Sequence, residues 1–305
     1  MKTIKNPWSN YWQKGVKASF LDERSRLQNY QMRKFWFERM DELTPKSPVV
    51  DIGTGNGIVV EWLSDYAAEK GKKLDITGID SATLNPPNKR LTLLAETPYE
   101  TFSLPKNKKV GTFVSHYGME YGNLDVGLEN LARQLKRGGS LVALVHSKES
   151  VIYRKSSEID ELLPSVIKHL KKSVYILQQA LLTQTGRGMP KSAQEAEQRL
   201  NQFVRKHQQK QAFHAMNFVP ATKHLLEAAA AGKKAESQKV FEDYLANVTE
   251  HRARLTTLFD ATDSLGDISD ITRRVEAAGF KEVKVQQVQF PETGIVGNCI
   301  QATKA

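Results

Sequence analysis

The sequence predicts an α/β protein built on a doubly wound, mostly parallel sheet. Residues 49–60 read VVDIGTGNGIVV, an apolar run that ends in an aspartate and passes into a loop with alternating glycines. A β-branched run of this kind is typical of a strand buried on both faces. Apolar residues recur at helical spacing after Gly57, and a second apolar run at 74–79 completes a strand–helix–strand unit. Residues 281–290 and 297–303 alternate on either side of PETG, which predicts a closing hairpin.

The glycine loop indicates a ligand site. Gly53, Gly55 and Gly57 permit a tight turn beside a bound molecule, at the N-terminus of the helix that follows. The dinucleotide fingerprint GxGxxG requires glycine where this chain has Ile58, and it includes no acid two positions before its first glycine. DIGTGNG instead resembles the glycine-loop motif of class I S-adenosylmethionine-dependent methyltransferases. The resemblance implies that Asp51 and the three glycines bind S-adenosylmethionine, while an ordinary strand-turn-helix is the alternative.

A second acid follows the second predicted strand. Asp80 stands 29 residues after Asp51, with one helix between them. This spacing places both carboxylates at the carboxyl ends of adjacent parallel strands, where open α/β sheets bind ligands. In the methyltransferases that the chain resembles, an acid at this position accepts hydrogen bonds from both ribose hydroxyls. The alternative is an exposed loop aspartate.

The next segment resembles the adenine-recognising region of the same family. The proline-containing stretch 81–89 is predicted to be a loop, and a third strand is predicted at 90–95. YETFSLP follows, and the resemblance places Glu100 and Thr101 near the adenine. Glu96 is the alternative acid.

The residues after the fourth predicted strand, 110–115, border the transferred methyl group in the methyltransferases that the chain resembles. Here they read SHYGMEY, without the Asp/Asn-Pro-Pro-Tyr that enzymes methylating nucleobase or glutamine amino groups often carry. We assign Ser115 to cofactor binding and His116 to a catalytic role, because an imidazole can accept a proton near neutral pH. A hydrogen-bonding role for His116 is the alternative. Tyr117 is expected to face the sulfonium, since an aromatic face attracts a cation.

A further histidine ends the fifth predicted strand. A helix at about 123–135 leads into LKRGGSLVALVHS, which resembles the family's turn before that strand, with arginine in place of the usual proline. His146 therefore lies on the ligand side of the sheet and is a second candidate base. A strand-capping role is the alternative.

The remaining segments are predicted to be accessory or closing parts. Residues 1–46 are rich in aromatic side chains, include a helix predicted at about 22–43, and resemble the N-terminal cover of many class I methyltransferases. Tyr11 and Trp12 are expected to close the site as a substrate lid, or else to pack against the core. Residues 151–265 show helical apolar stripes throughout and are predicted to be an insertion for substrate selection or dimerisation.

Together these segments predict the architecture that the resemblance implies. The cofactor-binding methyltransferase core spans 47–150 and resumes at 266–305, whose hairpin closes the sheet. The expected sheet is doubly wound and seven-stranded, mostly parallel with an antiparallel last strand, and carries the large helical insertion.

Composition limits the surroundings in which the protein works. Seven histidines and the single Cys299 show no compact metal-ligand spacing, so no metal is expected. No apolar run reaches the length of a membrane span, the N-terminus lacks a secretory signal, and one cysteine fits a reducing compartment, so a cytoplasmic location is expected. The net charge of +10 comes from 1–46 and 151–265, where basic residues outnumber acidic ones by 10 to 5 and 17 to 12. This excess favours an anionic substrate or partner, unless the lysines only solubilise the chain.

The sequence therefore predicts direct methyl transfer from S-adenosylmethionine to a small or medium-sized metabolite, and the basic excess favours an anionic one. One alternative is an RNA methyltransferase, although the basic residues are dispersed and no RNA-binding module is recognisable. Another is a non-catalytic S-adenosylmethionine-binding module that acts through its helical insertion. A homodimer formed through that insertion is possible.

Overall fold

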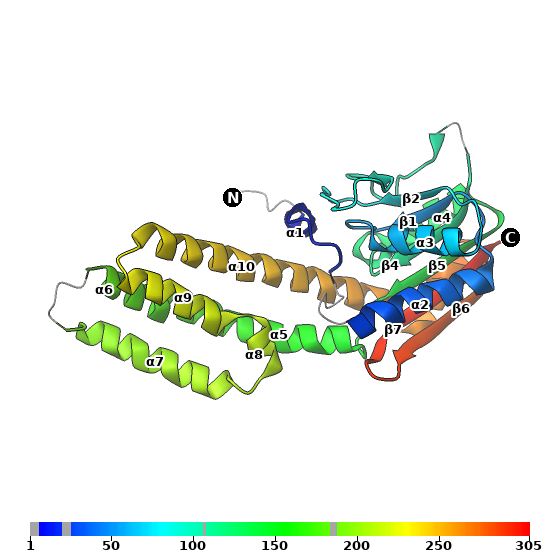
Figure 1. Ribbon diagram of the computed structural model, residues 1–305. Helices are drawn as coiled ribbons and strands as arrows, with labels where there is room; N and C mark the ends of the chain where they lie inside the picture. The colour runs from blue at the N-terminus through cyan, green and yellow to red at the C-terminus, as the bar shows by residue number, and fades with distance from the viewer. Residues whose placement is uncertain (1–5, 20–25, 106–107, 184–187) are drawn as a thin grey trace. The chain divides into compact units, whose positions relative to one another are not determined.

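The computed structural model describes residues 6–19, 26–105, 108–183 and 188–305 (Figure 1). Its contacts divide the chain into two compact units. Unit 1 comprises Met1–Tyr153 and Thr257–Ala305, and unit 2 comprises Arg154–Thr256. Unit 2 falls within the segment predicted as a helical insertion, so the predicted core residues lie in unit 1.

Seven strands of the described chain form one sheet in unit 1, in the order β3-β2-β1-β4-β5-β7-β6 (Figure 1). The strands are β1 Val49–Ile52, β2 Ile76–Ile79, β3 Leu93–Leu94, β4 Val110–His116, β5 Leu135–Val145, β6 Phe280–Phe290 and β7 Gly294–Lys304. Strands β1 to β5 pair in parallel, whereas β7 runs antiparallel to both β5 and β6. The predicted sheet and its closing hairpin are confirmed.

Helices cover both faces of this sheet because successive strand residues point to opposite sides. Val50 packs into a core that includes side chains of α4 (Leu124–Gln134) and α11 (Ile268–Ala277). Its neighbour Val49 packs into a second core with α2 (Arg26–Leu43) and α3 (Ile58–Glu69). Two separate apolar cores, one on each face, establish the doubly wound arrangement.

Some boundaries differ from those that the sequence predicts. Strand β3 is two residues long rather than the six of 90–95, because it pairs only with β2 and Leu94 is 43% exposed. Strand β5 begins at Leu135, before the glycine turn, since Leu135 already pairs with Val110. The start of the helix predicted at 22–43 lies outside the described residues, and α2 begins at Arg26.

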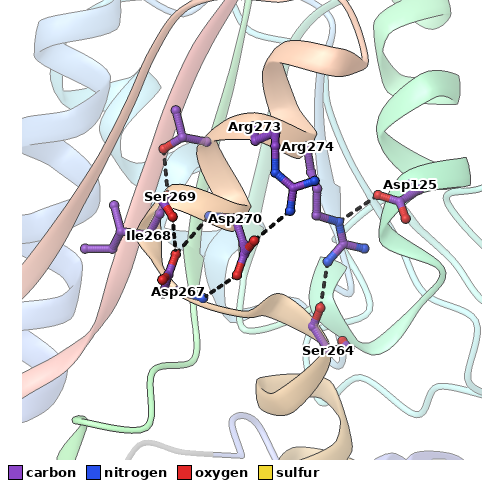
Figure 2. A network of polar contacts seen from close by, with 9 residues as sticks. Asp125, Ser264, Asp267, Ile268, Ser269, Asp270, Arg273 and Arg274 are labelled. Atoms are coloured by element: carbon purple, nitrogen blue, oxygen red, sulfur yellow. Dashed lines mark hydrogen bonds and ion pairs between the residues drawn. The ribbon is translucent and has the colours of Figure 1, made fainter.

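Helix α11 is fixed at its N-terminus by its own side chains (Figure 2). Asp267 accepts a hydrogen bond from the backbone N–H of Asp270, and Asp270 returns the contact to the backbone of Asp267, which forms a capping box. Arg274 then joins three helices of unit 1: its guanidinium donates to Asp125 at 2.7 Å and to the carbonyl oxygen of Ser264 at 2.6 Å. Ser264 belongs to the end of α10 (Lys234–Leu265), which is thereby held against α4 and α11.

Unit 2 is helical throughout its described residues. Its elements come from α5 Val151–His169, a π-helical turn Leu170–Val174, α6 Tyr175–Thr183, α7 Lys191–His207, α8 Gln211–Ala215, α9 Phe218–Ala230 and α10 Lys234–Leu265. Phe203 organises its core, with ring contacts to His169, Phe213 and Phe218. None of the described helices is both long and apolar enough to cross a membrane.

Candidate active site

A pocket of about 590 Å³ lies in unit 1 at the carboxyl ends of β1, β2 and β4. Its walls also include residues of the N-terminal helix α1 (Pro7–Gln13) and the last residues of α10. The edge of the sheet at the carboxyl ends of its parallel strands is where α/β folds of this kind bind ligands. This cavity is therefore the place where the predicted cofactor residues are expected to lie.

Asp51 lies at the base of this pocket as a buried acid, 1% exposed. One carboxyl oxygen, Oδ2, accepts a hydrogen bond of 2.6 Å from the Thr54 hydroxyl. The other, Oδ1, has no hydrogen-bond partner among the described residues. Burial raises the pKa of Asp51 to about 7, and the nearby charge of Asp80 adds to this rise. A buried acceptor of this kind is suited to a donor supplied by a ligand.

The glycine loop reaches the pocket at Gly53. A Cβ there would lie 2.5 Å from the Cα of Gly118, and a Cβ on Gly118 would lie 2.5 Å from the carbonyl oxygen of Ile52. The loops after β1 and β4 therefore touch only because both residues lack side chains. Gly55 and Gly57 have positive φ angles and shape the turn, but they do not line the pocket.

Asp80 joins Asp51 at the pocket and is 9% exposed. Its oxygens accept hydrogen bonds of 2.8 Å from the backbone N–H groups of Gly55 and Ala82. Burial raises its pKa, and these two hydrogen bonds partly offset that rise. Because β1 and β2 are paired neighbours, the sequence spacing of the two acids does place them in one cavity.

The predicted adenine side is represented by Glu100. It lines the pocket, and its Oε1 accepts the backbone N–H of Asn123 at 2.8 Å. Thr101 is exposed and outside the lining, as is the alternative acid, Glu96. The structure therefore brings one of the two predicted adenine-side residues to the site.

The side chains of Ser115 and His116 both form hydrogen bonds to other residues of unit 1. The Ser115 hydroxyl donates to the carbonyl oxygen of Ile52 and accepts the N–H of Met119, both at 2.9 Å, and the residue does not line the pocket. His116 does line it, but its Nδ1 accepts a hydrogen bond of 3.0 Å from Trp36 Nε1. The neutral ring must then carry its proton on Nε2, which leaves no basic nitrogen for a substrate. Burial also lowers the pKa of His116 to about 3, so the geometry favours the hydrogen-bonding alternative over the predicted base.

His146 is farther from the cavity. Its Nε2 lies 3.0 Å from the Tyr121 hydroxyl, its ring stacks on Tyr117 at 4.5 Å, and it is not a lining residue. Burial lowers its pKa to about 3, which disfavours a base here as well.

Tyr117 lines the pocket, and its hydroxyl donates a hydrogen bond to the carbonyl oxygen of Val296. Its contact with a sulfonium stays a prediction.

Helix α1 and the residues that follow it belong to the segment predicted as a cover, and they lie beside the pocket. Asn56, on the loop after β1, donates from Nδ2 to the carbonyl oxygens of Trp12 and Val16, at 3.0 and 2.7 Å. Trp12 lines the pocket, and its role as a lid stays a prediction. Tyr11 does not line it, and its hydroxyl instead donates to the carbonyl oxygen of Ala18 at 3.1 Å.

Neither protein-family profiles nor curated proteins match this chain. Several solved structures are similar to this chain. The SAM-dependent methyltransferase of Thermotoga maritima described as a possible histamine N-methyltransferase is 15% identical, over 92% of this chain and 97% of that one, with a TM-score of 0.36. The 1,6-didemethyltoxoflavin-N1-methyltransferase of Burkholderia thailandensis is 10% identical, over 97% of this chain and 84% of that one, with a TM-score of 0.42. The citrinin polyketide synthase CMeT domain is 11% identical over 92% of this chain and 53% of that one, with a TM-score of 0.44.

The sheet itself decides the fold. It has seven strands with helices packed on both faces, and β7 alone runs antiparallel. The chain has the class I methyltransferase fold. The pocket lies at the carboxyl ends of the parallel strands of that fold, and both Asp51 and Asp80 line it.

The pocket lining includes residues that were not predicted as site residues, among them Trp8, Glu120, Tyr121 and Asp260. Glu120 and Tyr121 belong to SHYGMEY, so an acid directly behind the fourth strand was an available signal. Asp260 comes from α10, and nothing in its local sequence relates it to the strand ends. Within the described ranges, no group of three His, Cys, Asp or Glu side chains could hold a metal ion.

We expect Asn56→Ala to release the cover while leaving the fold intact. The side chain is 2% exposed and bonds to Trp12, Val16 and the N–H of Asn85. Loss of these bonds costs about 2–3 kcal/mol at roughly 1 kcal/mol each. Trypsin cleavage at the lysines in 14–19 should therefore accelerate at least about 10-fold. Asn201→Ala, on an exposed face of α7, is the matched control, and equal cleavage of both variants would contradict this role for Asn56.

Proposed function

We propose that this chain binds S-adenosylmethionine in the pocket of unit 1 and transfers its methyl group to a small or medium-sized metabolite. The observation that carries the proposal is the pair of buried carboxyls, Asp51 and Asp80, at the carboxyl ends of adjacent strands in one cavity. The partnerless Oδ1 of Asp51 fits a cationic or hydrogen-donating group of this cofactor. Asp80 would accept hydrogen bonds from the ribose hydroxyls, and Glu100 would lie on the adenine side.

When bound, S-adenosylmethionine supplies an activated methyl group on a sulfonium, which is already a good leaving group. The protein's task is to hold the acceptor in line with the methyl carbon and to exclude water. Trp12 and the segment held by Asn56 cover the pocket for this purpose. Asp51 and Asp80, at the ends of β1 and β2, would hold the cofactor.

The lining of the pocket bears on the kind of acceptor. Five carboxylates line it, Asp51, Asp80, Glu100, Glu120 and Asp260, and its described lining includes no lysine or arginine. The basic excess of the chain therefore lies elsewhere, and the site favours a neutral or cationic acceptor over the anionic one that net charge suggests. The same lining disfavours a nucleic acid, whose phosphates require cationic contacts.

The test is incubation of the pure protein with methyl-labelled S-adenosylmethionine and a cell extract, with and without ribonuclease. We expect a labelled small molecule that survives ribonuclease treatment. Label that depends on intact RNA would support the RNA methyltransferase alternative. Cofactor uptake with no labelled product in extracts from several growth conditions would support the non-catalytic binding module.

A homodimer through the helices of unit 2 stays a prediction, as does a cytoplasmic location. Sedimentation equilibrium tests the first directly. A species of 34.3 kDa at all concentrations would exclude the dimer.

A further inference from the structure

Glu120 is a buried acid for which the fold itself provides only half of the required partners. It lies in the 3-10 turn Met119–Tyr121, between β4 and α4, is 1% exposed and lines the pocket. Its Oε1 accepts the backbone N–H of His146 at 2.9 Å. Its Oε2 has no hydrogen-bond partner among the described residues. A buried carboxyl oxygen without a partner is costly, so its presence at a cavity wall indicates a group that the ligand supplies.

Among the described residues that line the pocket, no lysine or arginine offsets this carboxylate. Tyr99, Tyr117 and Tyr121 interact with it electrostatically, and burial raises the pKa of each hydroxyl, so all three stay neutral. His116 and His146 are neutral as well, because burial lowers the pKa of each to about 3. Asp260, on the same pocket, is a further acid.

The ionisation of Glu120 is suited to proton transfer near neutral pH. Burial raises its pKa to about 7, while hydrogen bonds from its own backbone N–H and from that of His146 oppose this rise. A carboxyl with this pKa is a carboxylate in about half of the molecules at pH 7. An acid–base group is most effective when its pKa lies near the working pH.

Aromatic rings form the wall beside it. Trp8 and Tyr121 both line the pocket and meet edge to face at 5.3 Å, and Trp12 stacks on Trp8 at 6.1 Å. Such a corner offers a flat apolar surface and two π faces. It suits a planar ring and also attracts positive charge.

We propose that Glu120 is the catalytic base of the methyl transfer, and that the acceptor is a basic nitrogen carried by a small aromatic molecule. This inference rests on the proposed function. The aromatic corner of Trp8 and Tyr121 would hold the ring, and Glu120 Oε2 would receive a proton from the nitrogen. The histidines predicted for this task are left in positioning roles around the turn.

A protonated amine first passes one proton to Glu120 Oε2, which leaves a neutral amine beside a neutral carboxyl. The nitrogen lone pair then forms the bond to the methyl carbon, while the carbon–sulfur bond breaks and its electron pair stays on sulfur. The product leaves as an N-methylammonium ion beside the neutral thioether, and Glu120 returns its proton to solvent.

Binding to the protein loaded with S-adenosylhomocysteine tests the inference without turnover. Tryptamine and indole-3-propionate are the probes, because they share a ring and differ in the charge of the side chain. Calorimetry should show tryptamine binding at least 10-fold more tightly than indole-3-propionate at pH 8. Tryptamine affinity should rise nearly 10-fold between pH 6 and pH 8 as Glu120 ionises. Comparable binding of both probes, or a dissociation constant above 10 mM for tryptamine, would overturn the proposed acceptor class.

Glu120→Gln should weaken tryptamine binding at pH 8 at least 10-fold and make its rise with pH smaller than in the wild type. Asp51 also has a pKa of about 7, but it is present in both proteins, so the difference between them belongs to Glu120. Glu129→Gln, on the exposed face of α4, is the control and should behave as the wild type. Unchanged binding and an unchanged pH profile in Glu120→Gln would refute the role of this residue.

Cofactor affinity separates this inference from the proposed function. Wild-type protein and Glu120→Gln should bind S-adenosylmethionine and S-adenosylhomocysteine with similar affinities. If the variant loses 10-fold only for the sulfonium form, Glu120 balances the cofactor's charge and is not the base. If the wild type binds neither molecule, the proposed function itself fails. If Glu120→Gln does not fold, the comparison of tryptamine with indole-3-propionate in the wild type still tests the proposed acceptor class.

Discussion

Asp80→Ala should reduce the affinity for S-adenosylmethionine by at least about 100-fold. The carboxylate lies at the end of β2, lines the pocket and is held in place by the N–H groups of Gly55 and Ala82. Each hydrogen bond from a ribose hydroxyl to a carboxylate contributes about 1.5–3 kcal/mol. Loss of two such bonds therefore costs about 3 kcal/mol or more, which is about 100-fold in affinity. Calorimetry with S-adenosylmethionine and S-adenosylhomocysteine measures this effect.

Asp75→Ala is the matched control for this experiment. Asp75 precedes β2, at the end of the strand opposite to Asp80, and it is exposed and absent from the lining. Its replacement should leave the affinity unchanged. An Asp80→Ala protein that is folded and binds the cofactor within 3-fold of the wild type would remove Asp80 from the site.

The part of the fold that the sequence could predict is the part with short-range signals. The β-branched run before Gly53, the acid at Asp80 and the alternation around the hairpin each depend on neighbouring residues, and all three lie where expected. Strand β3 is shorter than predicted because an edge strand is limited by its single neighbour, β2, and not by its own composition. The early start of β5 depends on a distant partner, Val110.

The same distinction explains the site. Asp51 and Asp80 could be placed together because parallel strands bring their carboxyl ends to one edge. The role of His116 could not, since its Nδ1 is bonded by Trp36, which lies 80 residues earlier in the chain. Trp8 and Asp260 reach the pocket from opposite ends of the sequence, and only the folded chain relates them to Glu120.

Asp51→Asn should make the empty protein more stable at pH 8 while removing cofactor binding. The pKa of Asp51 is raised from 3.8 to about 7, so its protonated form is favoured by folding. The wild type therefore loses stability as pH rises from about 4 to about 7, and the full cost applies above that range. At 1.36 kcal/mol per pKa unit, the ionised Asp51 costs the folded wild type about 4 kcal/mol. The variant avoids this cost, but its unpaired amide costs about 1–2 kcal/mol, which reduces the gain in stability.

Thermal unfolding at pH 4 and pH 8 measures the difference. At pH 8 the variant should unfold about 4–8 °C above the wild type, for a net gain of about 2 kcal/mol. At pH 4, where both carry a neutral side chain, only the cost of the unpaired amide remains, and the variant should unfold about 2–8 °C below the wild type. Saturating S-adenosylmethionine should reverse the order at pH 8, because a ligand stabilises only the protein that binds it. Asp75→Asn, an exposed control, should unfold at the same temperature as the wild type under all these conditions. If Asp51→Asn is no more stable than the wild type at pH 8, Asp51 carries no buried charge in the protein without cofactor.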